Sequence, residues 1–251
     1  MNRSNPTADE LYETAQELAV SGRYAEAIDA YSSVFDSDPA HINARCGRGL
    51  ALQRIGEHSK AIADFDEVIS SLSDWPGIFV AYYSRAASRQ ALGQNVEAIE
   101  DCDEAISRNP ELTDALYLRG TVWKALGQVE EAVSDMDAVL DADPRYHEAY
   151  RVRGSLYYLQ QRWQQAIDDF TAAIEQSGNQ TEGNRQCIYL RGMAAQELGD
   201  HCAAIADFAQ VIEMLPDDAG AYLRRSRSYN ELGESALADA DFKFGSRLMQ
   251  R

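Results

Sequence analysis

Residues 113–146 read TDALYLRGTVWKALGQVEEAVSDMDAVLDADPRY, and this stretch decides the fold. Apolar residues recur at helical spacing on both sides of Gly127, as two amphipathic helices require. Gly127 permits a tight turn between the helices. Asp143-Pro144 ends the second helix, because a residue that precedes proline avoids the α conformation. The stretch is therefore predicted to fold as a helical hairpin.

The same pattern recurs along the whole chain. Six glycines stand at separations of 34, 37, 34, 72 and 34 residues, and Gln161 takes the place of the missing one: Gly22, Gly56, Gly93, Gly127, Gly199 and Gly233. A fixed period of this size is typical of a solenoid. After a leader of residues 1–7, the predicted units are residues 8–41, 42–78, 79–112, 113–146, 147–184, 185–218 and 219–251.

Composition narrows the class of protein. The 251 residues include 23 Lys and Arg but 41 Asp and Glu, a net charge of −18, which argues against a nucleic-acid or anionic-membrane partner. No apolar run is long enough to cross a membrane, and the amino terminus lacks the apolar core of a secretion signal. Four scattered cysteines do not form a disulfide framework. We expect a cytoplasmic protein.

Two positions of each unit hold small residues. The first helix has Ala15, Gly49, Ala86, Gly120, Gly154, Gly192 and Ser226 in one position. The second helix has Ala27, Ala61, Ala98, Ala132, Ala166, Ala204 and Ala238 in another. Small residues that face each other let two helices approach closely, so these positions are predicted to meet where the helices cross.

Charged residues repeat with the same period. Units two to seven share an arginine in the first helix, at Arg48, Arg85, Arg119, Arg153, Arg191 and Arg225. They share an aspartate in the second, at Asp64, Asp101, Asp135, Asp169, Asp207 and Asp241. Unit one lacks both and has Thr14 and Ala30 instead. Because a partly buried guanidinium needs a carboxylate, we predict that each arginine pairs with the aspartate of its own hairpin. The alternative is an arginine ladder that binds a ligand.

These features resemble the tetratricopeptide repeat (TPR) family, over residues 8–251. The family's aromatic, small, glycine, alanine, aromatic and proline positions are occupied in the fourth unit by Trp123, Gly120, Gly127, Ala132, Met136 and Pro144, with Met in place of the second aromatic. Departures are Gln161, Cys102 in the second aromatic position, and two longer junctions. The resemblance implies an all-α fold, a right-handed superhelical α-solenoid of seven TPR helical hairpins. It also implies that the first helices line a concave groove for a peptide or a partner's helix.

Groove residues are predicted on the face of the first helices opposite the buried stripe. One position holds four tyrosines and, in the fifth unit, an arginine: Tyr12, Tyr83, Tyr117, Tyr189 and Arg151. Nearby positions hold Leu118, Leu190, Met193, Gln196, Arg224, Arg227 and Asn230. Tyrosine offers apolar area with a hydroxyl, and amides can bond a peptide backbone. The alternative is that some tyrosines only cover neighbouring hairpins.

No catalytic or metal-binding pattern is found. The histidines lack metal-ligand spacing, Cys102 occupies a position that is aromatic elsewhere, and no phosphate-binding loop is present. We therefore predict no catalytic residue, no metal and no cofactor. Trp75-Pro76-Gly77 is compatible with a recognition loop or with a turn whose tryptophan folds onto the next hairpin.

The sequence thus predicts a non-catalytic scaffold that binds a neutral or acidic protein segment. The Lys, Asn, Asn, Lys and Arg positions of the family's chaperone-tail clamp fall on Tyr12, Gln16, Gly47, Val80 and Ser84, none of which is basic, so that mode is not expected. One alternative is self-association through residues 242–251, which lack a separate polar capping helix. A helical-repeat RNA binder and an enzyme are the remaining alternatives.

Overall fold

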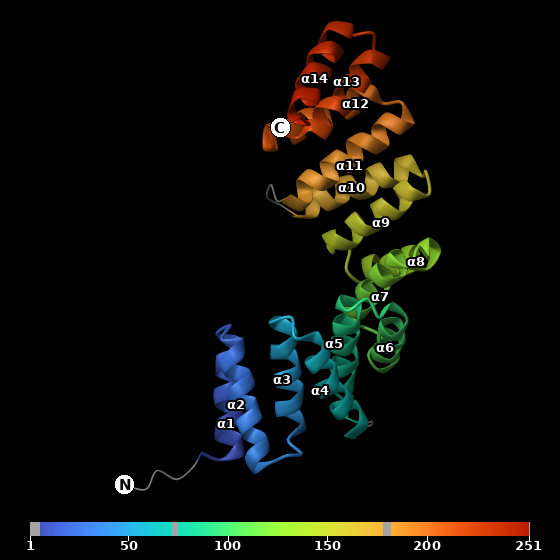
Figure 1. Ribbon diagram of the computed structural model, residues 1–251. Coiled ribbons are helices and arrows are strands. Elements are labelled where there is room, and N and C mark those ends of the chain that lie inside the picture. Colours follow the sequence, from blue (N-terminus) through green and yellow to red (C-terminus); the bar gives the residue numbers. More distant parts are fainter. Residues whose placement is uncertain (1–5, 72–74, 178–181, 251) are drawn as a thin grey trace. The chain divides into compact units, whose positions relative to one another are not determined.

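The computed structural model describes residues 6–71, 75–177 and 182–250, which form fourteen α-helices and no β-strand (Figure 1). The chain divides into two compact units, Met1–Gly127 and Gln128–Arg251. The first contains α1 (Ala8–Val20), α2 (Tyr24–Ser37), α3 (Ile42–Arg54), α4 (His58–Ser71), α5 (Ile78–Ala91), α6 (Asn95–Arg108) and α7 (Thr113–Ala125). The second contains α8 (Val129–Ala142), α9 (His147–Leu159), α10 (Trp163–Ser177), α11 (Glu182–Leu198), α12 (His201–Met214), α13 (Ala219–Glu231) and α14 (Ser235–Leu248). The fold is an α-solenoid of helical hairpins, as predicted.

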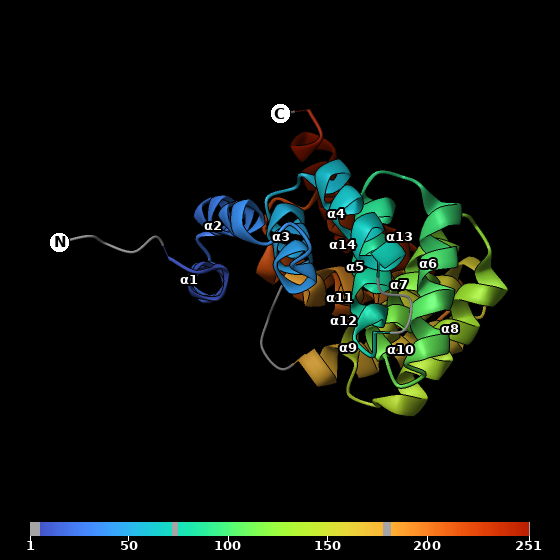
Figure 2. The same ribbon diagram turned by 90° about the horizontal axis from the view of Figure 1, so that it is seen from below.

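Consecutive helices pack as hairpins within each unit. In the first unit α1 packs on α2, α3 on α4 and α5 on α6, and these pairs lie side by side in chain order (Figures 1 and 2). In the second unit α9 packs on α10, α11 on α12 and α13 on α14. Each second helix also packs on the first helix of the next hairpin within its unit, so the hairpins α3–α4, α5–α6, α9–α10 and α11–α12 are covered on both sides.

The two layers of helices are not equivalent. First helices also contact the first helices of neighbouring hairpins, as in α1 with α3, α3 with α5, α9 with α11 and α11 with α13. No second helix makes such a backbone approach to another second helix within the described part of either unit. Elements on the inner side of a curved stack lie closer together than those on the outer side. The first helices therefore form the inner face of each unit.

Local signals fix the helix ends. The Thr7 hydroxyl accepts a hydrogen bond from the Glu10 backbone, and the Glu10 carboxylate accepts one from the Thr7 backbone, so α1 begins at Ala8. Most of the predicted leader, residues 1–5, lies outside the described residues. Six turns have a glycine with φ between 75° and 90°. Gln161 has φ 59° in the remaining turn, so it takes the glycine's left-handed conformation without being one.

The small position of the first helix is closed by an aromatic ring of the second. A Cβ added to Gly154 would lie 3.0 Å from the Phe170 ring, and one added to Gly192 would lie 3.1 Å from the Phe208 ring. Where the small position is Ala86, the ring is replaced by Cys102, and the two side chains share one buried cluster. The second-helix alanines are fully buried, but it is the ring that closes over the small position. In the hairpins of Gly49, Gly154 and Gly192, the glycine therefore leaves room for the phenylalanine ring of the second helix.

Replacing Gln161 by glycine is expected to stabilise the protein. The left-handed conformation costs a non-glycine residue about 1–2 kcal/mol, part of which glycine loses again in chain entropy. We expect a gain of about 0.5–1 kcal/mol in urea-induced unfolding. The matched control is Gly93→Ala, at a turn where nothing lies within 4 Å of the new Cβ, and it should lose a similar amount. Equal stability of all three proteins would contradict the argument.

Candidate functional site

The repeated arginines pair with the aspartates of their own hairpins. In each resolved pair the Nε and Nη2 atoms donate to the two carboxylate oxygens over 2.6–3.0 Å. The pairs are Arg48–Asp64, Arg85–Asp101, Arg153–Asp169, Arg191–Asp207 and Arg225–Asp241. All five aspartates are buried. The predicted pairing is confirmed in these hairpins, so these guanidiniums do not form a free ladder for a ligand.

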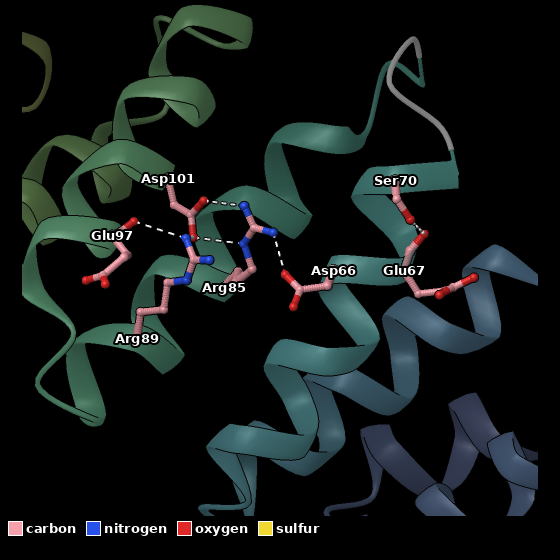
Figure 3. A network of polar contacts seen from close by, with 7 residues as sticks. All are labelled: Asp66, Glu67, Ser70, Arg85, Arg89, Glu97 and Asp101. Atoms are coloured by element: carbon pink, nitrogen blue, oxygen red, sulfur yellow. Dashed lines mark hydrogen bonds and ion pairs between the residues drawn. The ribbon is translucent and has the colours of Figure 1, made fainter.

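The same arginines also reach the preceding hairpin. Arg85 Nη1 donates to Asp66 of α4 at 2.5 Å while its other nitrogens hold Asp101 of α6, so the guanidinium lies between two second helices (Figure 3). Arg89 adds a third donor to Asp101 at 2.7 Å. Equivalent Nη1 bonds join Arg48 to Ser32, Arg119 to Asp103, Arg153 to Asp137 and Arg191 to Thr171. Arg48, Arg85, Arg153 and Arg191 thus each link successive hairpins as well as closing their own.

The amides of the predicted groove also hold the stack together. Gln196 is 4% exposed, and its amide donates to the Arg224 carbonyl at 2.8 Å and to the Ser228 hydroxyl at 2.7 Å. Gln53 makes the corresponding bonds from α3 to α5. Leu118, at 8% exposure, packs into the core of the third hairpin. Gln196 and Leu118 therefore stabilise contacts between hairpins, and we do not keep them in the candidate site.

The predicted tyrosines of the first unit are half-buried. Tyr12 accepts a hydrogen bond from the Gln16 amide at 2.9 Å, and its ring centroid lies 4.9 Å from that of His41. Tyr83 packs on the cluster that contains Cys102, and burial raises the pKa of its hydroxyl. Tyr117 is also half-buried. These rings are held largely by neighbouring helices.

The second unit brings predicted residues together on its inner face. Tyr189 and Met193 lie on α11, one turn apart, and Arg224 and Arg227 lie on α13. Tyr158, at the end of α9, completes the group, which we call the tyrosine–arginine patch. Burial raises the pKa of the Tyr158 hydroxyl, the positive charges of Arg224 and Arg227 oppose the shift, and Glu197 and Tyr189 add to it. The hydroxyl therefore lies within the field of two guanidiniums and one carboxylate.

The two tyrosine rings of the patch are held in place by aromatic side chains of the second helices. Trp163 meets the Tyr158 ring edge-on with centroids 5.0 Å apart, and Phe208 meets the Tyr189 ring edge-on at 5.6 Å. The Tyr189 hydroxyl reaches Gly220 at the start of α13, where an added Cβ would lie 3.1 Å away. Both tyrosines thus present fixed hydroxyls beside α13.

The arginines of the patch are only lightly engaged. Arg224 Nη1 donates to the Gln196 amide oxygen at 3.4 Å, and Arg227 lies 3.5 Å from the Glu197 carboxylate with more than half of its side chain exposed. These contacts are longer than the 2.6–3.0 Å bonds of the paired arginines. The two guanidiniums keep donors for an outside acceptor.

Tyr158 is the residue that sequence reasoning missed. It occupies the position held by Gln53, Gln90 and Gln196 in other hairpins. The signal was the exchange of a structural amide for an aromatic residue at a position that joins first helices. Such an exchange removes the hydrogen bond between first helices that the amide makes and places a ring and a hydroxyl there instead.

The remaining predicted residues lie around the patch. Arg151 lines a hollow of about 330 Å³ with His147, Glu148 and Cys187. Leu190 is half-buried against the fifth hairpin, and Asn230 is exposed near the end of α13.

The Trp75 ring lies over Gly77 and packs on the cluster of Phe65, Val68 and Ile78. This is the packed turn rather than the recognition loop.

Cysteine chemistry is suppressed by burial where the structure gives a direction. Burial raises the pKa of the Cys46 thiol to about 11 and also raises that of Cys187. A thiol with such a pKa is protonated at neutral pH and a poor nucleophile. Over residues 6–71, 75–177 and 182–250, no three His, Cys, Asp or Glu side chains are grouped as metal ligands. Within those ranges, none of the helices combines the length and apolar character needed to span a bilayer.

Comparison with known proteins gives the same architecture. A sequence profile of the tetratricopeptide repeat family matches residues 12–74, 124–181 and 189–242. A curated relative is the "Tetratricopeptide repeat and J domain-containing co-chaperone DNJ1" of Cryptococcus neoformans var. grubii, 30% identical over 83 residues. The match covers 33% of this chain and 15% of that protein.

Crystal structures are similar over most of the chain. The C-terminal part of a TPR repeat-containing protein from Cytophaga hutchinsonii has a TM-score of 0.78 at 18% identity, covering 94% of this chain and 95% of that one. PilW, a type IV pilus biogenesis factor, has a TM-score of 0.70 at 20% identity, covering 85% and 96%. At these identities the likeness establishes the fold.

Removing one member of an arginine–aspartate pair is expected to destabilise the protein. Asp207→Ala leaves the Arg191 guanidinium partly buried without its carboxylate, which should cost about 3 kcal/mol of unfolding free energy in urea titrations. The double change Arg191→Met/Asp207→Leu should lose much less. Glu57→Ala, which breaks an exposed pair with Lys60, is the control and should stay within about 0.5 kcal/mol. A fully stable Asp207→Ala protein would show that the pairs are not structural.

Proposed function

The chain belongs to the tetratricopeptide repeat family, and from this premise we propose that it is a non-catalytic scaffold whose second unit binds a segment of a partner protein. The tyrosine–arginine patch is the binding surface. It joins α9, α11 and α13, so a segment laid across it contacts three hairpins at once. The observation that carries the proposal is the meeting of Tyr158, Arg224 and Arg227 on the inner face.

The composition of the patch favours an acidic segment. Arg224 and Arg227 retain donors that the hairpins do not use, whereas the repeated arginines are engaged by aspartates. A carboxylate placed between them also comes within reach of the tyrosine hydroxyls. Charge-assisted bonds of this kind are stronger than neutral ones and fix the register of a bound chain.

The apolar part of the patch favours a segment that also carries aliphatic or aromatic side chains. Met193 and the two tyrosine rings supply this area, and tyrosine does so at low cost in side-chain entropy because its ring is already fixed. We therefore propose a partner segment with an acidic residue beside an apolar one. The opposite layer of second helices, which carries most of the acids, would repel the same segment.

The relatives agree with a scaffold in general terms. One is named a co-chaperone and another a pilus biogenesis factor, and both names describe work on other proteins. A clamp for a chaperone tail is not part of the proposal. The positions that would supply its Lys, Lys and Arg side chains in the first three hairpins hold Tyr12, Val80 and Ser84, and those of its two asparagines hold Gln16 and Gly47.

Selection from a displayed library of random peptides tests the proposal. Wild-type protein should enrich sequences with Asp or Glu next to an apolar residue. The best peptide should bind the Tyr158→Ala/Arg224→Ser/Arg227→Ser protein at least about 2 kcal/mol more weakly by calorimetry, because anchor aromatics and charge pairs dominate such interfaces.

The matched control is Arg54→Ser/Arg145→Ser, which removes two exposed arginines that are not part of the patch. It should bind as the wild type does. Equal binding by the patch variant and the control would show that the second unit's inner face is not the binding surface.

A further inference from the structure

Successive hairpins pack on each other through the same few positions of the first helix. Three positions of each first helix face the hairpin before it, and Ala44, for example, packs in the cluster of Ala15, Ala27 and Tyr31. Two of the three are buried in every hairpin after the first. They are occupied by Ala44, Ala81, Ala115, Ala149, Cys187 and Ala221, and by Ala51, Ser88, Val122, Leu156, Ala194 and Ser228.

The first hairpin breaks this rule at all three positions. Its residues there are Glu10, Glu13 and Glu17, and all three are exposed on one face of α1. The third position is Gly47, Ser84, Leu118, Val152, Leu190 or Arg224 in the other hairpins. Thr14 takes the place of the repeated arginine in the same face. The outer face of α1 therefore carries three carboxylates, two of them where later hairpins bury small or apolar residues.

Second helices present a matching set to the hairpin that follows. Two positions are apolar in the first six hairpins, and Ile167 and Ile174, for example, pack on the cluster of Ile188. The residues are Ile28, Ile62, Ile99, Val133, Ile167 and Ile205, and Phe35, Ile69, Ile106, Leu140, Ile174 and Ile212. Between them lies the acceptor of the next arginine, which is Ser32, Asp66, Asp103, Asp137 or Thr171.

The last hairpin changes every one of these positions. Asp239 and Ser246 replace the two apolar residues, and Lys243 replaces the arginine's acceptor. Phe242, whose equivalents Phe170 and Phe208 are fully buried, is left 59% exposed. A hairpin of the inner type brought to this face would meet a carboxylate, a hydroxyl and a cation that repels its arginine.

We infer that both end faces bar the stacking of a further hairpin, so copies of this chain do not extend one another end to end. Polar outer faces on terminal repeats are what keep a solenoid from joining its neighbours. In this chain the terminal hairpins carry those polar residues themselves, in the positions that form every inner junction.

One attractive interaction would favour end-to-end stacking, and its free energy has to be compared with the cost of burying the end residues. In a head-to-tail contact, Lys243 would face the glutamates of α1. An exposed ion pair contributes only about 0–1 kcal/mol. Seating Glu10 and Glu17 where inner hairpins bury small or apolar residues would bury carboxylates at a cost of several kcal/mol each, and the contact would lack both apolar residues of the second helix. The free-energy cost of burying the carboxylates therefore exceeds the gain from the ion pair, and end-to-end stacking is unfavourable.

The inference bears on the self-association predicted for residues 242–251. Phe244 folds back on its own hairpin, with its ring centroid 4.7 Å from that of Tyr222. Phe242 and Met249 stay exposed but stand among Asp239, Lys243 and Arg247. Arg251 lies outside the described residues. This face does not reproduce an inner junction, and the conclusion is independent of the patch on the inner face.

Substituting the residues of inner hairpins into the first and last hairpins should allow copies of the chain to stack end to end. One variant copies an inner first hairpin, Glu10→Ala/Glu13→Leu/Thr14→Arg/Glu17→Ala/Ala30→Asp, and the other copies an inner last hairpin, Asp239→Ile/Lys243→Asp/Ser246→Ile. By light scattering after size exclusion, an equimolar mixture should approach twice the monomer mass, and one chain carrying both sets should form open-ended oligomers that grow with concentration. Wild type should not grow in this way.

The control replaces the opened first hairpin by Asp9→Ala/Asp29→Ala/Asp36→Ala, which changes the net charge equally at exposed positions away from the junction. Mixed with the opened last hairpin, it should form no complex. Circular dichroism establishes that each variant is folded. Open-ended growth of the wild type, or a mixture of folded variants that stays at the monomer mass, would overturn the inference.

Discussion

The arginine–aspartate pair is the interaction on which the order of the stack depends. In Arg48, Arg85, Arg153 and Arg191, two nitrogens of the guanidinium close one hairpin, and the third reaches the second helix of the hairpin before it. A lysine could not do this, because it offers a single point charge where arginine offers a planar fork. The pair fixes the crossing inside a hairpin and the spacing between hairpins at once. The first hairpin, which packs on no preceding hairpin in this chain, has Thr14 and Ala30 in place of the pair.

This use of arginine also explains how a chain of net charge −18 can offer a basic surface. The repeated arginines are engaged by carboxylates, so they add little to the field outside the protein. What remains on the inner face of the second unit is a small number of guanidiniums, of which Arg224 and Arg227 lie beside tyrosine hydroxyls. A few free donors in an otherwise acidic protein select among acidic partners better than a broad positive surface, because the surrounding acids repel non-specific polyanions.

Much of the fold could be read from the sequence because each hairpin repeats the same physical requirements. Glycines in left-handed turns, small residues under an aromatic ring and paired charges all recur with one period, so one hairpin predicts the others. The candidate site was harder, because the sequence places a residue on a face but does not tell whether a neighbour already uses it. Gln196 has the right position for a groove, but its amide already donates hydrogen bonds to α13. Tyr158 departs from the amides Gln53, Gln90 and Gln196 at the same position, and this departure places a ring and a hydroxyl on the inner face.

The positions that join hairpins also determine where the array unfolds locally. In a linear array each hairpin is held by its own contacts and by those with its neighbours. The first hairpin has Thr14 and Ala30 in place of the arginine–aspartate pair, so it has the weakest hold on the stack. The last hairpin keeps its pair through Arg225 and Asp241, but Ala209 offers that arginine no acceptor in the preceding helix. Local opening should therefore begin at α1 and α2. The tyrosine–arginine patch is built on α9, α11 and α13, so such opening can occur without disturbing the helices that hold its residues in place.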